Sequence, residues 1–127
     1  MPIFESNLTE DGAMTTVLIV DDDAALRRMM ALTLRDSGFD VTSAGDGIQA
    51  LDKMDQGAPD AIVLDLEMPQ MDGRAFYREM RSRGYTSPVV IVSAHGARNA
   101  HRELGANAWL DKPFDPDALV SGIQSII

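Results

Sequence analysis

The sequence predicts an α/β fold with a doubly wound, five-stranded parallel sheet. Short, β-branched apolar runs alternate with amphipathic stretches five times along the chain. The runs are continuous rather than alternating, which is typical of strands that helices cover on both faces. The length of 127 residues fits one domain. Repeated strand–helix units with right-handed crossovers and this size favour the strand order 2-1-3-4-5.

The first half of the chain supplies three of these strands. The run TVLIV over residues 16–20 predicts a buried strand, and Gly38 ends the helix that follows it. A weaker strand is expected over 40–44, a helix that begins at Asp46, and a third strand over 61–64. The apolar residues that we expect these two helices to bury are Leu26, Met29, Met30, Leu34, Ile48, Leu51 and Met54.

The second half supplies the remaining two strands. A third helix is marked by the apolar residues around Phe76 and ends near Gly84. Asp115 and Pro116 predict the start of the last helix, with a capping carboxylate followed by proline at the first position. The other expected elements are a strand over 88–92, a short helix over 97–104 and a strand over 108–110. The inward residues of the last helix are expected to be Leu119, Ile123, Ile126 and Ile127.

Composition excludes several classes of protein. Eleven basic against twenty acidic residues give a net charge of −9, which disfavours binding to nucleic acid or to anionic membranes. The absence of cysteine excludes a disulfide scaffold and a thiolate metal site. No apolar run approaches the ~20 residues of a membrane span, and the first residues lack the features of a secretory signal. We therefore expect a cytoplasmic domain over 15–127, preceded by a flexible, polar tail over 1–14.

Polar side chains follow four of the five expected strands. Asp21 and Asp22 follow the first strand, Asp65 the third, Ser93 the fourth and Lys112 the fifth. In sheets of this topology, ligands bind beyond the carboxyl ends of the strands. Because the first and third strands are neighbours in the predicted order, we expect the carboxylates to converge there, with the hydroxyl and the ammonium beside them.

Three converging carboxylates call for a cation. At ~4 Å and an effective dielectric constant near 20, each pair of carboxylates costs roughly 4 kcal/mol. Hard oxygen ligands suit Mg²⁺. Together with a nucleophilic carboxylate, a hydroxyl and a lysine, the set indicates phosphoryl transfer. A plainer interpretation treats residues 21–23 as a helix cap that complements the helix dipole. It suits Asp23, but it leaves Asp65 and Lys112 unexplained.

Four segments together resemble the receiver domain of two-component response regulators. They are VLIVDDDAALRRMM, AIVLDLEMPQMDG, PVVIVSA and LDKPFD. They occur in order with consistent spacing, and the resemblance covers residues 15–127. It implies a flavodoxin-like fold and a bacterial signalling switch that is gated by phosphorylation. The implied phosphoryl donor is the phosphohistidine of a sensor histidine kinase or of a phosphotransfer protein.

The resemblance also implies roles for the acidic residues. Asp65 corresponds to the phosphoacceptor. Asp22 and Asp65 would bind Mg²⁺ directly, together with the backbone carbonyl of Glu67. Asp21 would act through a metal-bound water.

Further roles follow from the same resemblance. Ser93 and Lys112 would contact the phosphoryl group, and the Lys112–Pro113 bond resembles the family's cis peptide. Trp109 occupies the family's aromatic switch position, although ordinary core packing is an alternative for a large aromatic there. Glu67 and His95 hold variable positions that flank the phosphoryl group, so we expect them to tune the reaction.

The stretch from Ser93 to Lys112 is about one helical turn shorter than in most members of that family. We therefore expect a short or irregular fourth helix. A downstream protein is expected to dock on the face formed by the fourth helix, the fifth strand and the fifth helix.

We expect a single-domain regulator or the receiver of a larger protein, and not a free-standing enzyme. Two alternatives stay open. One is a scaffold with the receiver fold but without phosphorylation. The other is a Mg²⁺-dependent aspartyl phosphatase, whose nucleophile follows the first strand and which needs a cap or specificity insert.

Overall fold

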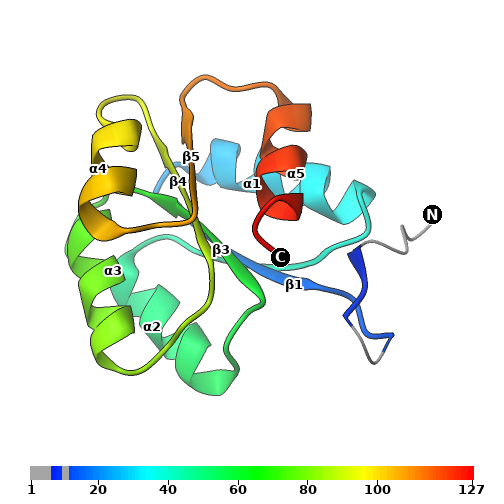
Figure 1. Ribbon diagram of the computed structural model, residues 1–127, viewed down its shortest axis with the longest axis horizontal. Coiled ribbons are helices and arrows are strands. Elements are labelled where there is room, and N and C mark those ends of the chain that lie inside the picture. Colours follow the sequence, from blue (N-terminus) through cyan, green and yellow to red (C-terminus); the bar gives the residue numbers. More distant parts are fainter. Residues whose placement is uncertain (1–6, 10–11) are drawn as a thin grey trace.

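The computed structural model describes residues 7–9 and 12–127, and these form one parallel sheet covered by helices (Figure 1). The strand order is β2-β1-β3-β4-β5, which confirms the predicted topology. The strands are β1 (Thr16–Val20), β2 (Asp40–Ala44), β3 (Ala61–Asp65), β4 (Val89–Ser93) and β5 (Ala108–Asp111). The helices are α1 (Ala24–Asp36), α2 (Gly47–Gln56), α3 (Gly73–Ser82), α4 (Ala97–Leu104) and α5 (Pro116–Gln124).

The sheet has one hydrophobic core on each face. Helices α1 and α5 cover one face, where Met30 and Leu34 pack with Leu119 and Ile123. Helices α2, α3 and α4 cover the other face, around the side chain of Phe76. Burial on both faces explains why the central strands consist of uninterrupted apolar residues.

The register of the strands aligns their carboxyl ends. Val20 pairs with Leu64, so Asp21 and Asp65 follow at the same level of neighbouring strands. Ser93 pairs with Asp111, which brings the end of β4 beside the end of β5. The polar residues that follow the strands therefore lie along one edge of the sheet.

Three helix starts differ in how they are capped. The Asp23 carboxylate accepts hydrogen bonds from the amides of Ala25 and Leu26, as its capping role predicts. Helix α5 begins at Pro116 with Asp115 at its N-cap, as predicted, but the Asp115 side chain makes no capping hydrogen bond, so only the capping role of its carboxylate was wrong. Helix α4 is only eight residues long and begins after Gly96, which offers no side-chain cap. The fourth helix is therefore short, as predicted.

Two isoleucines that were expected to face inward are exposed. Ile48 is 51% exposed and Ile127 is 46% exposed. The buried face of α2 is formed by the residues at 47, 50, 51 and 54, and Ile48 falls beside this stripe. Ile127 lies beyond the end of α5, so the helical spacing does not determine whether its side chain is buried.

The N-terminal segment is packed where the structure describes it. Residues 1–6 and 10–11 of the expected flexible tail lie outside the described ranges. Asn7, in contrast, is fully buried. Its side-chain amide donates to the Ser37 carbonyl and accepts from Gln124 Nε2 at 3.2 Å. An antiparallel bridge joins Leu8 to Met14 within the segment, and the contacts of Asn7 with Ser37 and Gln124 hold it against the domain.

Within the described residues, none of the helices combines the length and the apolar character needed to cross a bilayer.

Candidate functional site

The structure gathers the predicted acidic residues at the carboxyl edge of the sheet. Asp21, Asp22 and Asp65 each offer a carboxylate oxygen, and these oxygens lie within 4.8 Å of one another. Asp21 is fully buried and Asp65 is 2% exposed, whereas Asp22 faces solvent. The site is thus a partly open acidic cleft with two buried carboxylates at its base.

Lys112 links the two buried carboxylates. Its Nζ donates to Asp21 Oδ2 at 3.0 Å and to Asp65 Oδ1 at 3.2 Å. Burial lowers the pKa of Lys112, but the hydrogen bonds and charges of the two carboxylates outweigh burial and raise this pKa overall. The ammonium is therefore charged at neutral pH. The Lys112–Pro113 peptide bond is cis, in agreement with the sequence-based expectation.

Among the described carboxylates, Asp65 has the most strongly shifted pKa. Burial, followed by the negative charge of Asp21, raises the pKa of Asp65 from 3.8 to about 7, although Lys112 acts in the opposite direction. A nearby cation would favour the ionised form and bring this pKa down. The Asp65 side chain is therefore poised to become a nucleophile once positive charge is added to the cleft.

Asp21 is held in place by its own loop and by α1. Its Oδ1 accepts from the amide of Asp23 at 2.9 Å, and its backbone carbonyl accepts from Arg27 Nη1 at 2.7 Å. The arginine contact was not predicted from the sequence. A basic residue six positions after an aspartate carries no signal without knowledge of how the helix leaves the loop.

Ser93 and Glu67 form the other side of the cleft. Ser93 Oγ lies 2.5 Å from Glu67 Oε1 and 2.7 Å from the His95 carbonyl, and it accepts from the His95 amide at 3.0 Å. Glu67 also contacts Asp65 through its backbone amide, 3.4 Å from Asp65 Oδ1. The Ser93 hydroxyl is buried, while the Glu67 and His95 side chains are exposed.

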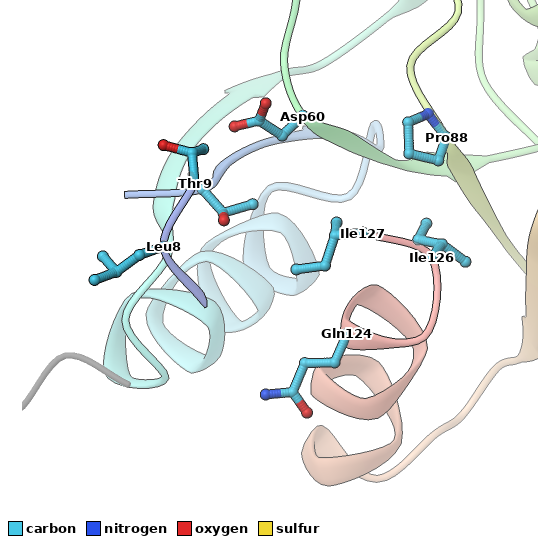
Figure 2. Close-up of a pocket in the computed structure, with 8 residues that line it drawn as sticks. Leu8, Thr9, Asp60, Pro88, Gln124, Ile126 and Ile127 are labelled. Atoms are coloured by element: carbon cyan, nitrogen blue, oxygen red, sulfur yellow. The ribbon is translucent and has the colours of Figure 1, made fainter. Parts of the chain in front are cut away.

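A second cavity lies at the opposite end of the sheet (Figure 2). It has a volume of about 700 Å³ and is lined by Leu8, Thr9, Thr15, Asp60, Pro88, Gln124, Ile126 and Ile127. Asp60 in its lining accepts hydrogen bonds from the backbone and hydroxyl of Thr16. This cavity therefore has a different chemical character from the acidic cleft and does not extend it.

Comparison with known proteins identifies the family. A family model described as the response regulator receiver domain matches residues 17–124. The chain belongs to this receiver domain family. It is also 36% identical over 114 residues to Response regulator MprA of Mycobacterium leprae (strain TN) and of Mycobacterium sp. (strain KMS). Each match covers 87% of this chain and 50% of the relative, so the receiver domain spans about half the length of these curated relatives.

Solved receiver structures share the fold over nearly the whole chain. Chemotaxis protein CheY4 of Vibrio cholerae, crystallised at low pH, superposes with a TM-score of 0.84 and 34% identity. The match covers 91% of this chain and all of CheY4. The Francisella response regulator 1452 receiver domain gives a TM-score of 0.80 and 30% identity, over 87% of this chain and 96% of that one.

The donor set of this receiver domain fits a hard divalent cation. Asp21, Asp22, Asp65 and Lys112 together carry an uncompensated charge of −2 when all are ionised, which a divalent cation would neutralise. Oxygen-only ligands with an open side suit Mg²⁺, which retains several waters. The cleft is thus compatible with Mg²⁺.

Gly73 is a site residue that the sequence reasoning missed. A Cβ atom on Gly73 would lie 2.3 Å from the carbonyl oxygen of Asp65 and 2.7 Å from Leu66 Cα. The Gly73 amide donates to the Leu66 carbonyl at 2.9 Å. Only glycine lets the start of α3 approach the backbone of Asp65 this closely. The signal in the sequence was the Asp-Gly pair seven residues after Asp65.

Proposed function

We propose that this receiver domain accepts a phosphoryl group on Asp65 in a Mg²⁺-dependent reaction. The proposed donor is a phosphohistidine of a sensor histidine kinase or a phosphotransfer protein. The observation that carries the proposal is the placement of Lys112 Nζ between the buried carboxylates of Asp21 and Asp65, beside exposed Asp22. A helix-capping role for residues 21–23 does not explain this arrangement, because Asp65 and Lys112 lie at the ends of β3 and β5 and not before α1.

The proposed step transfers one phosphoryl group between two nucleophiles. An oxygen of the Asp65 carboxylate forms a bond to phosphorus, and the bond from phosphorus to the imidazole nitrogen of the donor breaks. The imidazole keeps the bonding electron pair, and Asp65 becomes an acyl phosphate. Lys112 pairs with the phosphoryl oxygens, and the Ser93 hydroxyl donates to one of them.

The metal ligands are proposed from the same arrangement. Asp22 and Asp65 would hold Mg²⁺ directly with the backbone carbonyl of Glu67, and Asp21 would act through a water. When bound, Mg²⁺ supplies positive charge to the phosphoryl oxygens. The side chains of Glu67 and His95 flank this region and are proposed to tune the rate.

Trp109 is proposed to report the state of Ser93. Trp109 pairs with Ile91, two residues before Ser93 on the neighbouring strand, and packs in the core beneath α4. Alternate residues of a strand share a face, so Ser93 and Trp109 lie on the same side of the sheet. Movement of the hydroxyl toward a phosphoryl group would change the space available to the indole. A downstream protein that reads this change is proposed to dock on α4, β5 and α5.

Intact-mass measurement with acetyl phosphate and Mg²⁺ tests the proposal. We expect the mass to rise by one phosphoryl group, and Asp65→Asn to abolish the gain. Asp52→Asn is the matched control, because Asp52 is an exposed aspartate on α2. Equal labelling of the Asp65→Asn variant would place the acceptor elsewhere, and labelling without Mg²⁺ at the same rate would remove the metal from the reaction.

A further inference from the structure

Another cavity, lined by positively charged side chains, lies between α1 and the edge strand β2. It has a volume of about 250 Å³ and is lined by Ala24, Arg27, Arg28, Ala31, Arg35 and Ser43. The positions 24, 28, 31 and 35 follow helical spacing, so they form one stripe along the flank of α1. Because β2 ends the sheet, no further strand of the sheet covers this flank.

Within the described part of the chain, the three arginines of this cavity have no acidic partner within 4 Å. The chain carries twenty acidic residues and a net charge of −9. Yet among the described residues the salt bridges within 4 Å use only Arg74, Arg78, Arg83 and Lys112 as cations. Three guanidinium groups around one cavity repel each other, and an anion placed among them would relieve that repulsion.

Two of the three guanidinium groups are oriented by the backbone. Arg27 Nη1 donates to the Asp21 carbonyl at 2.7 Å, and Arg35 Nη2 donates to the Val41 carbonyl at 3.0 Å. A guanidinium has five N–H donors, so each keeps four for a ligand. Their orientation reduces the entropy that a bound anion must otherwise remove.

Ser43 adds a hydroxyl from the opposite wall. It lies two residues after Val41, which belongs to the core under α1, so its side chain points to the same face. Within the described residues, no hydrogen bond engages this half-buried hydroxyl. Alanines at 24 and 31 keep the space between the arginines open.

We propose that this α1–β2 cavity binds a small multivalent oxyanion, of the phosphate, diphosphate or dicarboxylate type. The planar fork of each guanidinium matches two oxygens of such a group. A nucleic acid fits less well, because its many phosphates would meet the strongly acidic remainder of the chain. The inference is independent of phosphorylation at Asp65.

Amide NMR titration of the full chain tests this site, with metal removed by a chelating resin because dissolved chelators are themselves multivalent anions. The probes are pyrophosphate, phosphate and succinate, each added at constant ionic strength. We expect saturable shifts along α1 from Ala24 to Arg35 and at Ser43. Tighter binding of pyrophosphate than of succinate assigns the site to phosphates, and equal binding assigns it to multivalent oxyanions in general.

Substitutions of the residues that line the cavity test whether the anion binds there. Arg28→Gln combined with Arg35→Gln is expected to weaken pyrophosphate binding about tenfold, equivalent to 1.4 kcal/mol. Arg27 is left unchanged because it holds the backbone of Asp21. Arg28→Gln alone and Ser43→Ala give weaker losses and avoid disturbing the Arg35 contact with β2. The matched control is Arg98→Gln with Arg102→Gln, two exposed arginines of α4. Equal weakening by the control, shifts that never saturate, or shifts confined to residues around Lys112 would overturn the proposal.

Discussion

The Ser93 hydroxyl and the Glu67 carboxylate lie 2.5 Å apart, at the place where the cleft opens beside Asp65. A hydroxyl has one proton, so Ser93 donates either to Glu67 or to the His95 carbonyl at 2.7 Å, and it has none left for a third acceptor. A phosphoryl group on Asp65 would have to take this proton from its present partner. Glu67 therefore competes with the phosphoryl group for Ser93.

Replacing Glu67 should accelerate phosphorylation. Glu67→Ala removes both the competing acceptor and a negative charge, and we expect labelling of Asp65 by acetyl phosphate to become about fivefold faster, as befits one hydrogen bond of ~1 kcal/mol. Glu67→Gln keeps an acceptor oxygen, so its gain should be smaller. Initial rates at fixed Mg²⁺ measure both effects.

A double-mutant cycle separates the hydrogen bond from the charge. In a Ser93→Ala background, Glu67 has no hydroxyl to hold, so the gain from Glu67→Ala should shrink. The same gain in both backgrounds would show that charge repulsion, and not the contact with Ser93, sets the rate.

The raised pKa of Asp65 predicts how stability depends on pH without metal. The folded state holds a proton on Asp65 up to about pH 7, whereas the unfolded chain releases it near pH 3.8. Between these values the folded state binds more protons than the unfolded state, so the contribution of Asp65 to the unfolding free energy falls as pH rises. Above pH 7 the contribution levels off.

Urea unfolding of the metal-free protein between pH 4 and 8 measures this contribution. The difference between the parent and Asp65→Asn should change over that interval, with the variant becoming relatively more stable as pH rises. Asp52→Asn serves as the control for charge alone. A parent–variant difference that is constant with pH would contradict the raised pKa.

Lys112 should stabilise the cleft most strongly when no metal is present. Lys112→Met leaves two buried carboxylates without a cation, and breaking such a pair costs roughly 3–5 kcal/mol. Added Mg²⁺ should restore more stability to this variant than to the parent, since it replaces the missing charge. Lys53→Met, on the exposed side of α2, is the control and should change stability little. A variant that Mg²⁺ stabilises no more than the parent would show that Lys112 and the metal do not share the same carboxylates.

The close approach of α3 to the backbone of Asp65 can be tested by substituting Gly73. Gly73→Ala places a methyl group 2.3 Å from the Asp65 carbonyl, so the loop must shift, and we expect a loss of roughly 1–3 kcal/mol together with weaker Mg²⁺ binding. Gly122→Ala in α5 is the matched control. Its Cβ would meet side chains only at 3.9 Å or beyond, so it should stabilise the helix by roughly 0.5–1 kcal/mol. Thermal unfolding measures the stability of both variants. An equal change in stability in the two variants would contradict the steric clash at Gly73.

The strands and the acidic cleft were predictable because they depend on local pattern and on topology. Apolar runs fixed the strand positions to within a residue or so, and the strand order then placed Asp21 beside Asp65. Partners that depend on tertiary contacts were not predictable. The Arg27 contact with the Asp21 carbonyl and the fit of Gly73 behind Asp65 depend on how their loops turn, and the burial of Asn7 depends on contacts with Ser37 and Gln124, which lie far along the chain.

The two exposed isoleucines show a second limit of prediction from sequence, which concerns residues wrongly expected to be buried. Ile48 and Ile127 are apolar and close to helical stripes, but a difference of one position, or the end of the helix, moves them out of the core. A periodic pattern predicts which face of a helix is buried better than it predicts the residues at the edge of that face.

Trp109 offers a spectroscopic test of the switch, because it is the only tryptophan of the chain. It is half-buried in the core beneath α4, on the same face of the sheet as Ser93. If an acyl phosphate draws the Ser93 hydroxyl away, the indole gains space, and the equilibrium between two packings shifts. We expect its emission to change when Mg²⁺ and beryllofluoride, a phosphoryl mimic, are added. Asp65→Asn should abolish the change, and Ser93→Ala should reduce it while Mg²⁺ still binds. An unchanged spectrum under conditions where binding of the mimic is confirmed by NMR would leave Trp109 as ordinary core packing, because a switch residue must differ between the two states.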